Sequence, residues 1–266
     1  MSGSVNSTKE NLALSSFLGV VRGITVHTLI YPLEVIKIRY QCSPNNSRYI
    51  RIALELLQRE GAAAFYKGLA PQLLKTSIKQ IWCWPMITGV PPLLQRYNLG
   101  NLSQQVFTGL SIATVDACIS TPLERAKIVS AFRGSQSQFK NFYSDGWRGF
   151  AVHWSKLSAN WVAFLTAQKY LRDRSHSSSD RSLSLPQLTI IGTQVALIVS
   201  VLSAPFDIAN TLKQAKNISP SQLWRYGIPT LYRGWPLNAL SLIIHNIASV
   251  VLIDKIDVYQ RKTRVV

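Results

Sequence analysis

The chain has 266 residues, and its 29 Lys and Arg outnumber its 12 Asp and Glu, so the formal net charge is +17. Apolar residues make up 47% of the chain and charged residues only 15%, against roughly 25% charged in an average soluble domain. The apolar fraction and the seven Trp exclude a disordered chain, and three Cys exclude a disulfide framework. Two classes remain: a basic protein that binds nucleic acid, and a membrane protein with positively charged loops.

The first eleven residues are short and polar. They have neither the basic and then apolar pattern of a secretory signal nor the Arg-rich amphipathic pattern of a transit peptide. We therefore expect residues 1–11 to form a polar N-terminal tail.

Six apolar stretches follow, each near the length of about 20 residues that a membrane span requires. In chain order they are Leu14–Pro32, Leu69–Leu94, Val106–Thr121, Phe150–Gln168, Leu188–Pro205 and Pro236–Ile253. Only the last two contain no Lys, Arg, Asp or Glu. Charged groups inside a membrane usually face an interior or water, so the interrupted stretches predict a helical bundle around a polar path. The alternative is a soluble all-helical protein with amphipathic helices.

Two short motifs each occur three times along the chain. The first, a Pro, an apolar residue and an acid, starts at Pro32, Pro122 and Pro205, and the second, aromatic-base-glycine, ends at Gly68, Gly149 and Gly234. Because both recur in the same order, they predict tandem repeats of helix, polar connector and helix. The repeats are expected at residues 12–98, 103–174 and 187–260, with a polar linker at 175–186 and a basic tail at 261–266.

The connectors between the two helices of each repeat differ. Ile50–Leu57 in the first connector has an amphipathic pattern that predicts a short surface helix. The second connector is shorter and rich in Ser and Gln near Gly134–Phe139. Each motif proline ends an apolar stretch, and a proline inside a helix predicts a kink.

At these motifs the sequence resembles the mitochondrial carrier family, over about residues 12–260. The resemblance implies an all-α membrane protein with six transmembrane helices and threefold pseudosymmetry, whose termini lie on the intermembrane-space side. It implies a multi-pass, monomeric protein of the mitochondrial inner membrane, with a central substrate site reached alternately from each side. One interpretation of the chain's divergence is a copy encoded by an intracellular pathogen and sent to host mitochondria.

The resemblance implies a matrix gate in which the acid of each odd-numbered helix pairs with the base of the next. Carried over to this chain, Glu34 pairs with Lys127 and Asp207 pairs with Lys37. Gln41 matches the glutamine that braces such a bridge. Desolvation offsets much of the attraction in a partly buried ion pair, which suits a gate that has to open.

Two departures from the family pattern concern its gates. The third bridge lacks a base, because the position expected to face Glu124 is Asn210, and we expect a hydrogen bond there instead. The cytoplasmic gate is mostly missing, and of its expected acids only Asp254 is present. A weak cytoplasmic gate predicts net, even one-way, transport in place of obligatory exchange.

The substrate site is expected on the helices that follow the three glycines. A residue seven positions after each glycine lies about 10 Å along its helix, and one four positions further shares its face. The family's contact points and these neighbours give a set of Lys75, Lys79, Lys156, Leu157, Asn160, Ser241 and His245, to which the first helix adds His27. Three lysines favour an anion, since lysine binds phosphate or carboxylate as a point charge.

An adenine nucleotide such as ATP or ADP is the favoured substrate. Lys75 fits the pattern of adenine nucleotide carriers and Leu157 half fits it, whereas Lys156 and Ser241 depart from it. Lys156 imitates only the charge of an arginine found in keto-acid carriers, so phosphate and di- or keto-carboxylates remain alternatives. The Trp residues available to stack a base are Trp82, Trp84, Trp154 and Trp161.

The basic surplus is interpreted as a means of binding anionic lipid. The three aromatic-base-glycine motifs open helices, where free backbone N–H groups and a base hold a phosphate, and in the family such sites bind cardiolipin. The residues concerned are Lys67, Gly68, Arg148, Gly149, Arg233 and Gly234.

Several functions are not supported by any motif. The sequence lacks nucleic-acid recognition patterns, an activated nucleophile or a phosphate loop, so we expect neither nucleic-acid binding nor an enzyme. We expect no cofactor and no metal, and interpret His27, His153 and His245 as hydrogen-bonded interior residues. The rival interpretation is a carrier-fold membrane scaffold or receptor that no longer transports.

Overall fold

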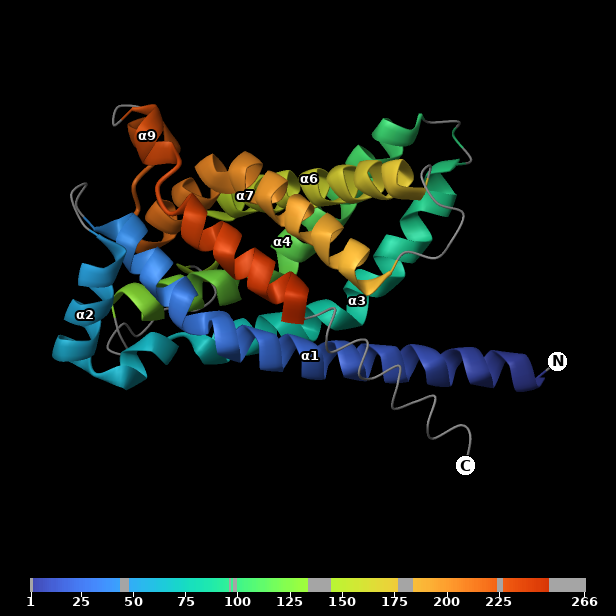
Figure 1. Ribbon diagram of the computed structural model, residues 1–266, viewed down its shortest axis with the longest axis horizontal. Coiled ribbons are helices and arrows are strands. Elements are labelled where there is room, and N and C mark those ends of the chain that lie inside the picture. Colours follow the sequence, from blue (N-terminus) through green and yellow to red (C-terminus); the bar gives the residue numbers. More distant parts are fainter. Residues whose placement is uncertain are drawn as a thin grey trace.

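The structure is a computed structural model that describes residues 2–43, 48–95, 97, 100–133, 145–176, 184–223 and 227–248. Over these ranges the chain is helical and contains no strand, as predicted (Figure 1). The elements are α1 (Ser2–Cys42), α2 (Tyr49–Glu60), η1 (Ala62–Tyr66), α3 (Leu69–Gln95), α4 (Asn101–Arg133), α6 (Phe150–His176), α7 (Leu185–Lys216), α8 (Pro220–Leu223) and α9 (Ile228–Leu231). A further helix covers residues 235–248.

The long helices coincide with the six apolar stretches. Five of the stretches lie wholly inside α1, α3, α4, α6 and α7, and the sixth begins in the helix at 235–248 and runs beyond the described residues. Two helices in the described part of the chain, Leu102–Phe132 within α4 and Leu185–Lys216, are long and apolar enough to cross a membrane. Helix α1 begins at Ser2, so the expected N-terminal tail is helical from that residue on.

The first connector contains the predicted surface helix. Helix α2 buries Ile52 and Leu56 and exposes Arg51 and Glu55, which is the two-faced pattern expected of a helix lying on the protein surface. The amphipathic helix predicted there is therefore confirmed. The Ser- and Gln-rich second connector lies outside the described residues.

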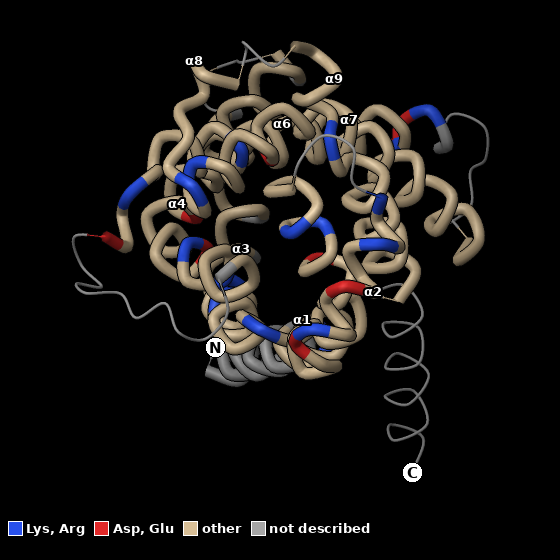
Figure 2. The backbone as a smooth tube through the Cα atoms, turned by 90° about the vertical axis from the view of Figure 1, so that its left-hand side faces the viewer, with Lys and Arg blue, Asp and Glu red and all other residues tan. Residues whose placement is uncertain are grey.

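The three helices that contain the motif prolines pack against one another. Pro32, Pro122 and Pro205 lie inside α1, α4 and α7. Each of these helices contacts the other two, while α3 packs on α1 and α4, and α6 packs on α4 and α7. Seen from the end at which α2, α8 and α9 lie, the helices surround a common axis (Figure 2).

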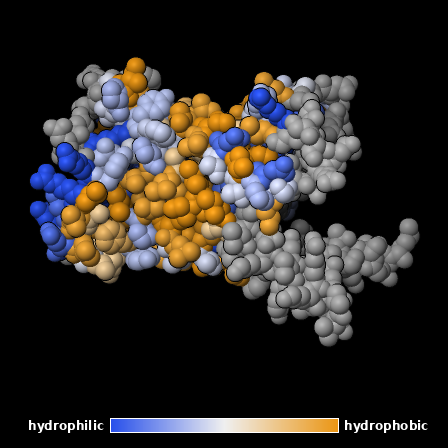
Figure 3. Space-filling view, in the orientation of Figure 1, coloured by the Kyte–Doolittle hydropathy of each residue, from blue (hydrophilic) through white to orange (hydrophobic). Residues whose placement is uncertain are grey.

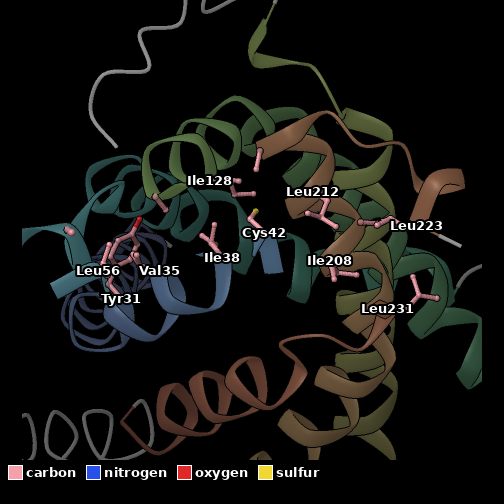
Figure 4. Close-up of a cluster of buried hydrophobic side chains, with 14 residues drawn as sticks. Tyr31, Val35, Ile38, Cys42, Leu56, Ile128, Ile208, Leu212, Leu223 and Leu231 are labelled. Carbon is pink, nitrogen blue, oxygen red and sulfur yellow. The ribbon is translucent and has the colours of Figure 1, made fainter. Parts of the chain in front are cut away.

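A hydrophobic cluster closes the bundle at the end where α1, α4 and α7 converge (Figure 4). Tyr31, Ile128 and Ile208 come one from each of these helices, and each is at most 1% exposed. Leu223 of α8 and Leu231 of α9 pack into the same cluster. This core fixes the C-terminal halves of the three helices, which carry the motif acids and bases.

The landmark glycines repeat one relationship around the bundle. Gly68 lies against Lys127 of α4, Gly149 lies against Lys213 of α7, and Gly234 lies against Gln41 of α1. All three have φ angles near +90°, a conformation that favours glycine. Each repeat therefore packs its glycine on the first helix of the next repeat in cyclic order, which is the contact pattern expected of threefold pseudosymmetry.

The outer surface of the bundle is apolar over its middle. Figure 3 shows apolar residues across the centre of the visible face and hydrophilic residues gathered at the end where α2 lies. Leu29 is 70% exposed, Ile81 69% and Leu202 55%. Large exposed apolar surfaces mark interaction sites, and a band of this kind suits contact with lipid chains.

Candidate functional site

Two ion pairs expected of the matrix gate are present. Nζ of Lys127 lies 2.8 Å from Oε2 of Glu34, which joins α4 to α1. Nζ of Lys37 lies 3.1 Å from Oδ2 of Asp207, which joins α1 to α7. Glu34 and Lys37, like Glu124 and Lys127, are three residues apart and share one face of a helix, and the core described above brings these faces together. That these pairs act as a gate stays a prediction.

Gln41 contacts the second of these pairs. Its Nε2 donates to Oδ2 of Asp207 at 3.0 Å and to the backbone carbonyl oxygen of Arg233 at 3.3 Å. The side chain thus ties α7 to the turn that carries the third landmark glycine. Gln41 is 3% exposed, so its hydrogen bonds do not compete with bulk water.

The hydrogen bond expected between Glu124 and Asn210 is not formed among the described residues. Oδ1 of Asn210 accepts from Gln214 one turn further along α7, and its Nδ2 is buried without a partner. Glu124 instead accepts from two lysines of the expected substrate site, Lys75 at 2.5 Å and Lys156 at 3.2 Å. The longer lysines of α3 and α6 reach Glu124, whereas the short Asn210 amide does not.

Lys156 links two acids of the expected gate. In addition to Glu124 it contacts Asp207, with Nζ 2.8 Å from Oδ1. Glu124 also lies 3.8 Å from Lys127, three residues further along the same helix. Charged residues of the expected gate and two lysines of the expected substrate site therefore form one connected set of ion pairs.

This set of ion pairs, named here the central network, contains four lysines and three acids. It consists of Lys37, Lys75, Lys127, Lys156, Glu34, Glu124 and Asp207. The side chains of Glu124 and Asp207 are only 2% and 5% exposed. Removing one partner of a buried pair typically costs about 3–5 kcal/mol, so each acid depends on its lysines. With four lysines and three acids, the network has a net charge of +1.

A separate ion pair lies near the network. Nζ of Lys79 is 2.7 Å from Oδ2 of Asp116, and the same oxygen accepts from Nε1 of Trp161 at 3.4 Å. Lys79 also stands over the Trp161 ring, 4.8 Å from its centroid. The sequence analysis named Lys79 and Trp161 but did not pair them with Asp116.

The histidines of the expected site lie together. The rings of His27 and His245 have centroids 5.3 Å apart, and Nε2 of Gln72 lies 3.3 Å from Nδ1 of His27. His153 bonds through Nε2 to Oγ of Ser120 at 3.0 Å, as expected of an interior histidine. In the described part of the chain no group of three or more His, Cys, Asp or Glu is placed to hold a metal ion.

The remaining members of the expected substrate site differ in their surroundings. Leu157 packs in a hydrophobic cluster with Ala113 and Ala117 of α4, so its side chain belongs to a helix contact. Ser241 is buried and Asn160 is half-buried. Of the Trp residues named for stacking, Trp161 contacts Lys79 and Trp154 donates to Oγ1 of Thr114 at 3.1 Å.

The expected lipid-binding residues have unequal surroundings. Arg233 donates to the carbonyl oxygen of Ser43 at 2.7 Å and stands over the Tyr40 ring, whereas Arg148 is exposed. The carbonyl oxygens of the glycines at 68, 149 and 234 each accept the N–H four residues later, which marks the start of a helix. Lipid binding at these helix starts stays a prediction.

Sequence reasoning missed an ion-pair cluster on the connector. Glu60, at the end of α2, accepts from Lys67 at 2.7 Å and from Arg39 at 3.1 Å. Burial alone would raise the pKa of Glu60, but the hydrogen bonds and charges of Lys67 and Arg39 together outweigh it and lower that pKa. In the sequence, the only sign of this cluster is an acid at the end of an amphipathic helix. Such an acid does not identify its partners elsewhere in the sequence.

Comparison with known proteins finds similarity to mitochondrial carriers. A family model described as mitochondrial carrier protein matches residues 8–98. The chain is 23% identical to the mitochondrial 2-oxodicarboxylate carrier of Rattus norvegicus, covering 84% of this chain and 83% of the relative. It is 20% identical to the mitochondrial dicarboxylate/tricarboxylate transporter of Arabidopsis thaliana, covering 92% of each chain. A 56-residue stretch is 39% identical to the thylakoid ADP,ATP carrier protein of Arabidopsis thaliana, covering 21% of this chain and 14% of that one.

Pairs of helices in cyclic contact, joined at their converging ends by buried ion pairs, suit a protein built from tandem repeats. The chain is similar, at low identity, to members of the mitochondrial carrier family. The relatives are named as carriers and transporters.

Proposed function

We propose that this protein carries a small organic anion across the mitochondrial inner membrane by alternating access, with Lys75 and Lys156 as its principal binding residues. One observation carries the proposal. Both lysines, from different repeats, converge on the single carboxylate of Glu124. Two ammonium groups that share one carboxylate also fit the carboxylate or phosphate group of a substrate.

The central network gives this site a mechanism. A substrate anion that binds Lys75 and Lys156 takes the place of Glu124 and Asp207. Those acids lose part of the positive charge that neutralises them, and the ion pairs that hold α1, α4 and α7 together weaken. Binding free energy from the substrate thereby offsets the cost of separating the helices. The surplus positive charge of the network favours an anion over a neutral solute.

A dicarboxylate is the substrate class that this geometry supports best. Lys156 already contacts two separate carboxylates, those of Glu124 and Asp207. A molecule with two carboxylates at a short separation reproduces that arrangement. Three relatives that match over most of their length are named as carriers of 2-oxodicarboxylates or of di- and tricarboxylates.

An adenine nucleotide is the second candidate. The stretch shared with two chloroplast ADP,ATP carrier proteins of Arabidopsis thaliana is 39% identical but short. Trp161 also lies beside Lys79, where a base and a phosphate would find an aromatic ring and a cation within reach of one another. The proposal of a nucleotide thus rests on similarity over a shorter stretch of sequence than the proposal of a dicarboxylate.

The transport mode follows from the weak cytoplasmic gate. On α6, Lys169 and Arg172 stand where the family pattern has an acid and a base, while Asp254 lies outside the described residues. Because the sequence there departs from the family's pattern of acid and base, we propose that the empty carrier reorients without substrate. We therefore expect uptake without a counter-substrate. Tight one-for-one exchange at every substrate gradient would contradict this expectation.

Anionic lipid such as cardiolipin is proposed to bind at the helix starts after Gly68, Gly149 and Gly234. Exposed Arg148 supplies a base at the second of these sites. The N–H groups of a first helical turn have no partner within the helix and attract phosphate. Replacing Arg148 with Ala should weaken retention of cardiolipin by the purified protein more than replacing Arg51, whose side chain is 74% exposed on α2.

The experiment is uptake into liposomes that contain the purified protein. Radiolabelled 2-oxoglutarate, malate, phosphate, ADP and ATP are each offered to empty liposomes and to liposomes preloaded with the same compound. The dicarboxylate proposal predicts uptake of the first two, and nucleotide uptake alone would replace it with the second candidate. No uptake of any anion by folded protein would favour the non-transporting scaffold.

A further inference from the structure

A buried carboxylate stands beside the proposed substrate path without being part of the central network. Asp116 is 2% exposed, and its Oδ2 is held by Lys79 at 2.7 Å and by Trp161 at 3.4 Å. Among the described residues no ion pair joins Lys79 or Asp116 to the central network. An acid next to an anion path works against anion binding, so its presence requires an explanation.

Lys79 lies where a substrate anion would reach it. It follows Lys75 by four residues on α3, and residues at this spacing share one face of a helix. The two lysines thus lie one helical turn apart along the bundle interior, and an anion bound to Lys75 can also bind Lys79. Lys79 is held by a single carboxylate, whereas Lys75 and Lys156 share Glu124.

We propose that Asp116 takes up a proton when the substrate anion displaces it from Lys79, so that the carrier moves one proton with each anion. In this exchange the ion pair between Lys79 and Asp116 breaks, and an ion pair between Lys79 and the substrate forms. One proton from water binds the freed carboxylate and neutralises it. When the anion leaves on the other side, Asp116 releases the proton there and pairs with Lys79 again. The inference rests on the proposed anion transport.

The physical reason lies in the surroundings of Asp116. A carboxylate that loses its cation in a buried site is far costlier than the neutral acid, so such a group neutralises. The groups that face Asp116 are Lys75, Lys79 and Cys83 on α3 and His153 on α6. Lys75 is engaged by Glu124 and His153 by Ser120, so Lys79 is the cation that Asp116 depends on.

Trp161 makes the exchange reversible. Its Nε1 hydrogen bonds to the same oxygen that Lys79 contacts, and this donor holds the carboxyl group in place when Lys79 turns to the substrate. The face of its ring attracts the ammonium group, so Lys79 keeps a favourable position in both arrangements. The three side chains come from α3, α4 and α6, and a proton on Asp116 therefore stays at the junction of three helices.

The test measures substrate accumulation against a proton gradient. Liposomes with the transported anion outside carry a pH-sensitive dye inside, and the membrane potential is held at zero with potassium and valinomycin. If one proton accompanies each anion, the steady-state ratio of internal to external substrate rises about tenfold for each pH unit of inward proton gradient. In Asp116→Asn this ratio no longer depends on the gradient, whatever the absolute rate.

Asp173→Asn, an exposed acid near the end of α6, serves as the matched control and should keep the full dependence. If Asp116→Asn does not fold, the double variant Lys79→Gln with Asp116→Asn restores a neutral hydrogen-bonded pair and carries the same expectation. Accumulation by the wild type that ignores the gradient, or by either variant that still follows it, would overturn the proposal. Absence of anion uptake by the wild type would instead contradict the proposed function.

Discussion

Nζ of Lys156 lies 2.8 Å from Oδ1 of Asp207, which joins a residue of the proposed substrate site to an acid of the expected gate. Lys156 also contacts Glu124 at 3.2 Å, so the lysine is shared between two carboxylates from different helices. A substrate anion that binds Lys156 has to compete with both. This competition links binding to the opening of the bundle, and it determines how variants of the network should behave.

Glu124→Gln should bind substrate more tightly and transport it more slowly. The variant removes the carboxylate that occupies Lys75 and Lys156, so affinity should rise by roughly tenfold, equivalent to about 1.4 kcal/mol. The closed state loses the same ion pairs, so the maximal rate falls. Binding is measured by isothermal titration in detergent and transport by uptake. Weaker binding together with slower uptake would show that Glu124 does not compete with substrate.

Gln41→Ala should weaken the closed bundle without touching substrate. Gln41 donates to Asp207 and to the carbonyl oxygen of Arg233, and a buried hydrogen bond of this kind contributes about 1 kcal/mol. Thermal unfolding should therefore occur at a temperature lower by a few degrees. Gln222→Ala, whose amide oxygen accepts from Ser219 on an exposed turn, is the matched control. If both variants lower the unfolding temperature equally, Gln41 does not stabilise the bundle in the way proposed.

Gly68→Ala should destabilise the protein strongly. A Cβ at this position would lie 2.7 Å from the carbonyl oxygen of Lys127, at a φ of +90°. Left-handed strain and overpacking together are expected to cost at least about 2 kcal/mol. Gly89→Ala is the control, because nothing lies within 4 Å of its added Cβ; in mid-helix it should gain up to about 1 kcal/mol. Thermal unfolding of both variants at one detergent concentration gives the comparison.

The cluster around Glu60 predicts a dependence of stability on pH. Its folded pKa lies below the ordinary value of 4.5, because the hydrogen bonds and charges of Lys67 and Arg39 outweigh burial. The stability from Glu60 is thus fully present above its unfolded pKa, and it is lost as the pH falls through the folded pKa.

At pH 7 Glu60→Gln should lower the unfolding free energy by about 1 kcal/mol, since the cluster is partly exposed. The difference from wild type should shrink below pH 4. Glu55→Gln, whose Glu is 51% exposed beside Arg51, should match the wild type throughout. A gap between Glu60→Gln and wild type that stays constant from pH 7 to pH 3 would contradict this account.

The helical fold and two ion pairs were predictable from the sequence for a physical reason. Motif residues that recur in each repeat fix which helix faces meet, so Glu34 with Lys127 and Lys37 with Asp207 follow from spacing and the family resemblance. The surface helix α2 follows from its alternation of apolar and polar residues. These features depend on local periodicity, which one sequence displays directly.

The partners of Lys75, Lys79 and Lys156 were not predictable in the same way. Whether Glu124 is reached by Asn210 or by lysines depends on side-chain length and on the depth at which α3, α6 and α7 lie beside α4. Leu157 was assigned to the substrate site from its position next to Lys156, but successive residues on a helix point in different directions. These questions concern the relative rotation of helices, which spacing alone does not determine.

The most direct test of the account is uptake of a dicarboxylate by the double variant Lys75→Ala with Lys156→Ala in liposomes. The two lysines are proposed to bind the substrate, so the rate should fall at least about 100-fold, the effect of roughly 3 kcal/mol of lost charge-assisted bonding. Arg51→Ala, which removes a charge exposed on α2, should keep the wild-type rate. Dicarboxylate uptake by a folded Lys75→Ala, Lys156→Ala protein at the rate of Arg51→Ala would contradict the central role of these lysines.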